Sequence, residues 1–211
     1  MKRILALLLS ICLMTSFAFP ALAAPGQTSG AATTLRLEST TGTVQMKNAA
    51  GVTLQNTKGA RLYNGYTLST QKSSYAYVSL DQTKAIKLDA STGTSVFQSG
   101  KMLELKVLSG QIFFNVTAPL QANESLTIRT STMVTGVRGT CGWVEMVDRH
   151  TTRIALLEGK LDVTSKDPLT NLQRTTTIVG GQIATIVYHG DEQEQIAGTV
   201  SEDVTIQDMI E

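Results

Sequence analysis

The chain has 211 residues, with 18 Lys and Arg against 17 Asp and Glu, and its formal net charge is +1. Hydrophobic residues make up 42% of the chain and charged residues 17%, which argues against disorder of the whole chain. The balanced charge lacks the basic footprint of a nucleic-acid-binding protein, and an aromatic content of 5% is too low for a large stacking surface.

Residues 1–23 have the parts of a secretory signal peptide. Lys2 and Arg3 precede an apolar run over residues 4–19, and an Ala-x-Ala sequence ends at Ala23. We expect cleavage after Ala23 and an exported protein, periplasmic or extracellular. The apolar run is shorter than the ~20 residues of a comfortable transmembrane helix, and no later run approaches that length, so no membrane span is expected after cleavage. An uncleaved membrane anchor is the alternative.

Residues 35–190 form a series of short runs in which apolar and polar residues alternate. The clearest run is residues 74–80, where Ala76, Val78 and Leu80 share one face. Similar runs, separated by Gly, Ser and Asp, lie at residues 84–88, 102–108, 111–116, 126–129, 143–147, 153–157, 160–164 and 183–188. This pattern predicts an all-β domain of many short antiparallel strands, arranged as stacked sheets, a barrel, or a roll or solenoid.

Two segments outside this series differ in composition. Residues 24–34 are small and polar, which is typical of a flexible lead-in. Residues 191–211 form a polar tail, in which Ser201 could cap a short helix running to Ile210. The chain stops abruptly at Glu211, and a longer natural protein is an alternative.

A small glycine-containing unit recurs along the chain. Residues 108–114 resemble residues 157–163, and residues 41–44 and 179–183 echo them. We interpret each unit as a strand end, a glycine turn and a new strand, which is the chemistry of a hairpin. The uneven intervals between the units exclude a solenoid of fixed period, whereas a roll-like stacking of sheets stays open.

Three segments in order resemble the FecR domain. These are residues 59–80, residues 105–116, and a Val-Arg-Gly-Thr sequence followed by a strand and a Glu-Gly pair; the last segment contains Val137, Arg138, Gly139, Thr140, Glu158 and Gly159. The resemblance covers roughly residues 40–165 and implies an all-β domain outside the cytoplasmic membrane. Its best-known members relay a signal to an anti-sigma segment inside the cell. Only Met1, Lys2 and Arg3 precede the apolar run here, so we do not expect that activity.

Two places in the domain could contact a partner. Tyr75 and Tyr77 lie opposite the apolar face of their strand, and Lys87 would join them if its strand pairs with theirs; rigid tyrosines are good binding anchors. Ordinary cross-strand pairing is the alternative for this patch. For Arg138 we expect a structural role, in which its guanidinium binds backbone carbonyls or Glu158, with contact to a partner as the alternative.

The remaining reactive residue types form no recognisable site. Cys12 lies in the expected signal peptide, which leaves Cys141 as the sole cysteine of the mature chain; we expect it to be buried as a small apolar residue, with Trp143 in the core or at an edge. His150 and His189 lack partners at zinc-site spacing. We therefore expect no metal, no cofactor and no catalysis.

Together these features predict an exported, non-catalytic interaction module. It would sense or scaffold by binding a protein of the cell envelope. The alternative is a structural or adhesive surface element that recognises glycan or wall material. The low aromatic content favours a protein partner, because glycan sites use several exposed aromatic rings.

Overall fold

The computed structural model describes residues 35–166 and 173–188, so the expected signal peptide, lead-in and C-terminal helix lie outside the described residues. Within these ranges, no helix is present that could cross a membrane. The prediction of an all-β fold is confirmed. Its sixteen strands are β1 Leu35–Thr41, β2 Val44–Lys47, β3 Thr53–Leu54, β4 Arg61–Leu62, β5 Thr67–Thr70, β6 Tyr75–Ser79, β7 Lys84–Leu88, β8 Gly93–Ser99, β9 Met102–Val116, β10 Ser125–Arg129, β11 Met133–Gly136, β12 Cys141–Met146, β13 Thr151–Glu158, β14 Lys160–Lys166, β15 Gln173–Val179 and β16 Gln182–Val187.

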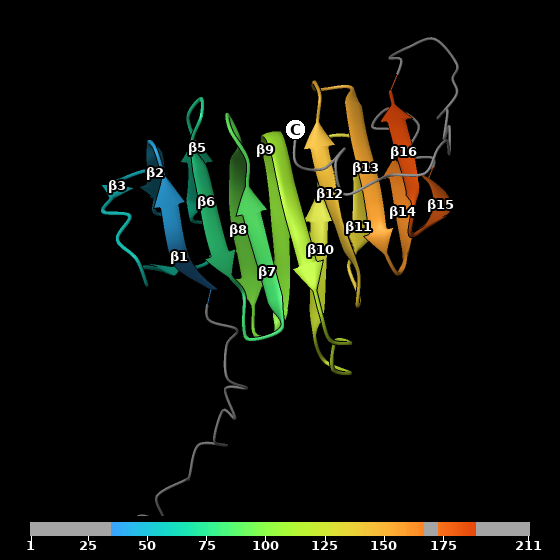
Figure 1. Cartoon of the computed structure of the whole chain (residues 1–211), viewed down its shortest axis with the longest axis horizontal. Helices are drawn as coiled ribbons and strands as arrows, with labels where there is room; N and C mark the ends of the chain where they lie inside the picture. The colour runs from blue at the N-terminus through green and yellow to red at the C-terminus, as the bar shows by residue number, and fades with distance from the viewer. Residues whose placement is uncertain (1–34, 167–172, 189–211) are drawn as a thin grey trace, which may run out of the picture.

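The strands form two sheets that lie one behind the other (Figure 1). Sheet A, in front, has the order β4-β1-β6-β7-β9-β12-β13-β16. Sheet B, behind, has the order β3-β2-β5-β8-β9-β10-β11-β14-β15. Every pairing among the described strands is antiparallel except that of β9 with β10. The two sheets do not close into a barrel, and the stacked-sheet prediction is confirmed.

Strand β9 belongs to both sheets. Its first half pairs with β8 and β10, and its second half pairs with β7 and β12. The sequence predicts two strands here with a turn at Ser109 and Gly110, and that prediction is wrong. Gly110 has a φ of +71°, which lets the strand bend from one sheet into the other without reversing.

The prediction that the recurring glycine units are hairpin turns is also wrong. Gly42 joins β1 of sheet A to β2 of sheet B, Gly159 joins β13 to β14, and Gly180 with Gly181 returns the chain to sheet A. The strands joined in this way do not pair with each other. Each unit is therefore a corner between facing sheets, which is the roll-like alternative. A glycine at positive φ suits such a corner as well as it suits a hairpin, so the local sequence did not distinguish the two.

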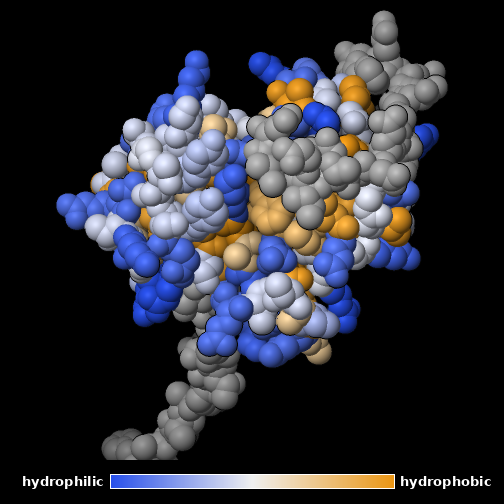
Figure 2. Space-filling model, viewed as in Figure 1, coloured by the Kyte–Doolittle hydropathy of each residue, from blue (hydrophilic) through white to orange (hydrophobic). Residues whose placement is uncertain are grey.

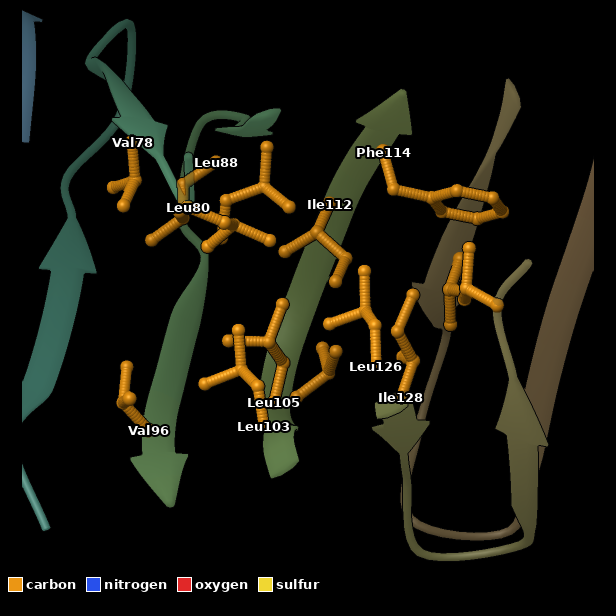
Figure 3. Packing of buried hydrophobic residues seen from close by; sticks show 14 of the residues in the cluster. Val78, Leu80, Leu88, Val96, Leu103, Leu105, Ile112, Phe114, Leu126 and Ile128 are labelled. Atoms are coloured by element: carbon orange, nitrogen blue, oxygen red, sulfur yellow. The ribbon is translucent and has the colours of Figure 1, made fainter. Parts of the chain in front are cut away.

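The core lies between the sheets and consists mostly of aliphatic side chains, together with Phe114 (Figure 3). The predicted inward face of β6 is confirmed, because Ala76, Val78 and Leu80 are at most 1% exposed. Phe114 from sheet A and Ile128 from sheet B are fully buried as well. Burial of this kind contributes roughly 25 cal/mol per Å² of apolar surface and holds the two layers together.

Three buried threonines add a polar contact between the sheets. Thr130 and Thr132 lie in the turn between β10 and β11 of sheet B, and Thr152 lies in β13 of sheet A. The Oγ1 atom of Thr152 is 2.8 Å from the Oγ1 atoms of both other residues. All three residues are at most 6% exposed, so their hydroxyl groups satisfy one another away from water.

A charged cluster joins the β6–β7 turn to the segment before β10. The Lys84 side chain is only 10% exposed; its ammonium contacts Asp81 and lies 3.4 Å from Oε2 of Glu124. Burial works to raise the pKa of Asp81, but hydrogen bonds from Lys84 and Thr83 outweigh it and hold that pKa below its usual value. Burial works to lower the pKa of Lys84, but the carboxylates of Asp81 and Glu124 outweigh it and raise that pKa above its usual value.

Candidate functional site: the outer face of sheet A

The predicted tyrosine–lysine patch forms on the outer face of sheet A. Strand β6 directs Tyr75 and Tyr77 outward, and Tyr77 lies directly opposite Lys87 of β7. The Lys87 ammonium lies 4.7 Å from the centroid of the Tyr75 ring, within the range of a cation–π contact. Tyr77 is 45% exposed. The structure therefore brings the three residues together, and their role in binding stays a prediction.

The patch continues across the sheet as a single row of cross-strand neighbours. Lys87 lies opposite Phe113 of β9, and Phe113 lies opposite Trp143 of β12. Trp143 in turn faces Ala155 of β13, which faces Ile183 of β16. We call the six residues Tyr77, Lys87, Phe113, Trp143, Ala155 and Ile183 the outer row. Neighbours of this kind across paired strands interact directly.

The outer face of sheet B has a different character. It carries charged and hydroxyl pairs: Arg129 forms a bidentate ion pair with Glu104, at 3.1 Å for both contacts, and Thr164 lies 3.0 Å from Thr175 between their Oγ1 atoms. Phe97 is its one strongly exposed aromatic residue among those described. Figure 2, which looks onto sheet A, shows hydrophobic surface at the centre of that face with hydrophilic residues beside it. The row of aromatic cross-strand neighbours thus lies on the outer face of sheet A, whereas the exposed apolar residues on the outer face of sheet B are Phe97, Met102, Leu108 and Val179.

Trp143 is the most deeply buried aromatic residue of the outer row. It is 4% exposed although it points away from the core, and the Arg153 guanidinium lies 5.4 Å from the centroid of its ring. Arg153 also pairs with Glu145, with 3.3 Å between Nη1 and Oε2. The indole Nε1 of Trp143 is buried and has no hydrogen-bond acceptor among the described residues.

The FecR-like motif has a structural explanation at the corners. Val137 is fully buried, and its amide donates a hydrogen bond of 2.8 Å to the Leu126 carbonyl. Gly139 and Thr140 form the corner before β12, and Gly159 of the next corner lies directly on them with a φ of +95°. A Cβ atom on Gly159 would lie 2.7 Å from Cγ2 of Thr140 and 2.8 Å from the Gly139 carbonyl oxygen. The motif therefore lets two corners stack in contact.

The expected tie through Arg138 is absent. The Arg138 side chain is exposed, and its guanidinium makes no hydrogen bond or ion pair with any residue in the described ranges. Glu158, the expected partner, is exposed as well. The corner is held instead by backbone hydrogen bonds and by the glycine contact, which leave the arginine side chain outside. Arg138 is thus free to meet solvent or a partner.

The surroundings of Cys141 and His150 do not resemble those of a reactive site. Cys141 is half-buried on the outer face of sheet A, and not fully buried as the sequence predicts. Burial, followed by the nearby Glu158 carboxylate, raises the pKa of its thiol and so disfavours the reactive thiolate. His150 donates its backbone N–H to Asp148 in a turn. No group of three His, Cys, Asp or Glu within the described ranges could hold a metal ion, and His189 lies outside them.

Comparison with known proteins gives one family match and two similar structures. Residues 66–162 match the family described as FecR protein. Two crystal structures, each described as "a putative anti-sigma factor from Parabacteroides distasonis ATCC 8503", are 17% and 18% identical to the chain, both with a TM-score of 0.48. The matched regions cover 61% of this chain and 56% and 57% of theirs, so the chain spans less than two thirds of their length. No curated protein matches the chain.

The family match begins just before β5 and ends within β14. It contains the stacked corners at Gly139 and Gly159, as well as five members of the outer row that lie on β6, β7, β9, β12 and β13. The resemblance predicted from the sequence is therefore confirmed. Over residues 66–162, the chain is similar to the FecR family.

Proposed function

We propose that the chain is a non-catalytic interaction module that is exported and binds another protein of the cell envelope through the outer row. The observation that carries the proposal is the outer row itself, in which Tyr77, Phe113 and Trp143 line up across the outer face of sheet A. Exposed aromatic side chains are enriched at protein-binding surfaces. Similarity to the FecR family supports a regulatory role that works through contacts with other proteins.

The end of the row at Tyr77 is the best candidate for the first contact. Tyr77 is 45% exposed, and the neighbouring Lys87 ammonium already lies over the Tyr75 ring. A ring and a cation that are held in place lose little conformational entropy on binding. A partner that offers a carboxylate beside an apolar side chain would fit this arrangement. Export is supported by the basic, apolar and Ala-x-Ala parts of residues 1–23.

Photo-crosslinking in the producing cells tests the surface. We would place benzoylphenylalanine at Tyr77 and, as a matched control, at Tyr63, which is 54% exposed but outside the outer row. We expect a discrete crosslinked product from the Tyr77 position, lost when Lys87 is changed to Glu, and no such product from Tyr63. Identical products from both positions, or none from Tyr77, would contradict the proposal.

Export has its own test. Fractionation of the cells and intact mass of the recovered protein should give a soluble species that begins at Ala24. A membrane-bound species that retains Met1 would contradict cleavage, and it would favour signalling from an anchored chain.

A further inference from the structure

One end of the outer row is covered, and the described strands do not supply the cover. Residues that point away from the core of a two-layer sandwich face solvent, as Tyr77 does at 45% exposure. Trp143 and Ala155 point the same way and are 4% and 0% exposed. No described strand packs on that face, and the Arg153 guanidinium covers only part of the indole. Something further must shield the row around β12 and β13.

The cover must also bring a hydrogen-bond acceptor. The Trp143 Nε1–H group is buried and has no acceptor within the described ranges. A buried donor without a partner is energetically costly. A carboxylate or a backbone carbonyl placed over Trp143 would remove that cost.

The segment after β16 has the required chemistry. Residues 189–211 contain seven Asp and Glu and no Lys or Arg. They also carry six larger apolar side chains, which are Ile196, Val200, Val204, Ile206, Met209 and Ile210. Lys87 and Arg153 are two cations on the outer face of sheet A that such a segment could contact. Lys87 has no carboxylate partner among the described residues, and Arg153 has a single one in Glu145.

The segment also begins directly after the strand that carries one end of the outer row. Among the described strands, β16 is the edge of sheet A on this side, and it carries Ile183, the last member of the outer row. Because neighbouring strands lie about 4.8 Å apart, Trp143 on β12 is about 10 Å from β16, and Lys87 on β7 is about 20 Å away. An extended segment of this length can span up to about 75 Å. Residues 189–211 can therefore reach any member of the row.

We propose that residues 189–211 fold back within the same molecule and dock on the outer row at its Trp143 end. Their apolar side chains cover Trp143 and Ile183, and their carboxylates face Arg153 and Lys87. The Tyr77 end stays open. This docking is independent of the partner proposed above, because the row can hold the chain's own segment whether or not it also binds another protein. Where both bind, the segment competes for the row and limits the partner to the Tyr77 end.

Intramolecular crosslinking of the purified full chain tests the docking directly. Benzoylphenylalanine would replace Phe113 in the outer row or, as the matched control, Phe97 on the outer face of sheet B. We expect the Phe113 position to crosslink to peptides of residues 189–211 in monomeric protein at high dilution, and the Phe97 position to give no such product. Overturning results are a Phe113 position that reaches no part of this segment, or that reaches it only in a second molecule.

Fluorescence gives a second readout, because Trp143 is the only tryptophan of the chain. In the full chain we would change Ile196, Val200, Val204 and Ile206 together to Ser, which leaves every described strand intact. We expect a red shift of the Trp143 emission and loss of its protection from acrylamide. An unchanged spectrum with unchanged quenching would show that the cover of Trp143 has another source and would overturn the proposal.

Discussion

The stacked corners make Gly159 the residue whose substitution best tests the architecture. Gly159 has a φ of +95°, and a Cβ at this position would lie 2.7 Å from Thr140 Cγ2 and 2.8 Å from the Gly139 carbonyl oxygen. The Gly159 carbonyl also accepts a hydrogen bond of 3.0 Å from the Gly180 amide, so the next corner moves with it. Gly159→Ala should therefore strain one corner and displace two others.

Two separate effects contribute to the loss of unfolding free energy expected for Gly159→Ala. An L-residue held at positive φ costs about 1–2 kcal/mol. Forcing an added carbon against close-packed backbone costs about 1–3 kcal/mol more, because the Gly139 carbonyl cannot rotate away as a long side chain could. We expect Gly159→Ala to lower the free energy of unfolding by roughly 2–4 kcal/mol.

Gly181→Ala is the matched control. Gly181 has a φ of +85° and no atom within 4 Å of its hypothetical Cβ, so its substitution carries the backbone strain alone. Urea unfolding of the three proteins, followed by circular dichroism, gives the two differences in unfolding free energy. The reasoning is refuted if Gly159→Ala destabilises the protein no more than Gly181→Ala does.

Three further substitutions test the core and the polar clusters. Phe114→Ala removes a fully buried ring and should lower the free energy of urea unfolding by about 3–5 kcal/mol. Thr152→Val removes the hydroxyl shared by the two neighbouring threonines and should lower it by about 1–3 kcal/mol, with loss of slow amide exchange in the β10–β11 turn. Against the opposing effect of burial, Lys84 holds the pKa of Asp81 low, so this carboxylate stabilises the fold above its unfolded pKa of about 3.9 and less so as the pH falls. Lys84→Met should therefore flatten the acid limb of the stability–pH profile, measured by urea unfolding between neutral pH and pH 3; an unchanged limb would contradict this.

The strands themselves could be predicted because their signal is local. In β7 the alternation of residues 84–88 matches the observed bounds, with Ile86 and Leu88 buried and Lys87 outward. The patch of Tyr75, Tyr77 and Lys87 could be placed for the same reason, since β6 and β7 are joined by a short turn and pair directly. A pattern with a period of two specifies faces without any knowledge of distant partners.

The corners could not be predicted because their signal is not local. A glycine at positive φ suits a two-residue hairpin and a corner between sheets equally well. What decides between them at Gly42 is that β1 pairs with β6, some thirty-five residues later, instead of with β2. The same applies to Gly110, where β9 continues because β7 and β12 take up its second half.

The rest of the outer row was missed for a related reason. Phe113 and Trp143 lie on runs that the sequence marks as strands, but their position beside Lys87 depends on the long-range pairing of β9 with β7 and β12. For Arg138, in contrast, the sequence predicted a contact that the structure does not show. Its chemistry suited a structural tie, but the glycine contact at Gly159 already holds the corner, and the guanidinium remains outside.

The residues of the corner motif and the residues of the outer row therefore have different structural roles. At the corners, Gly159 lies against Thr140 and the Gly139 carbonyl, where an added Cβ has no room. The outward side chains of Phe113 and Trp143 lie on regular strands, whose backbone tolerates many residues on the exposed face. A chain can thus keep the corner motif while its outer row changes. It follows that the corner contacts specify the two-sheet framework, and that the character of the outer face of sheet A depends on the side chains of its regular strands.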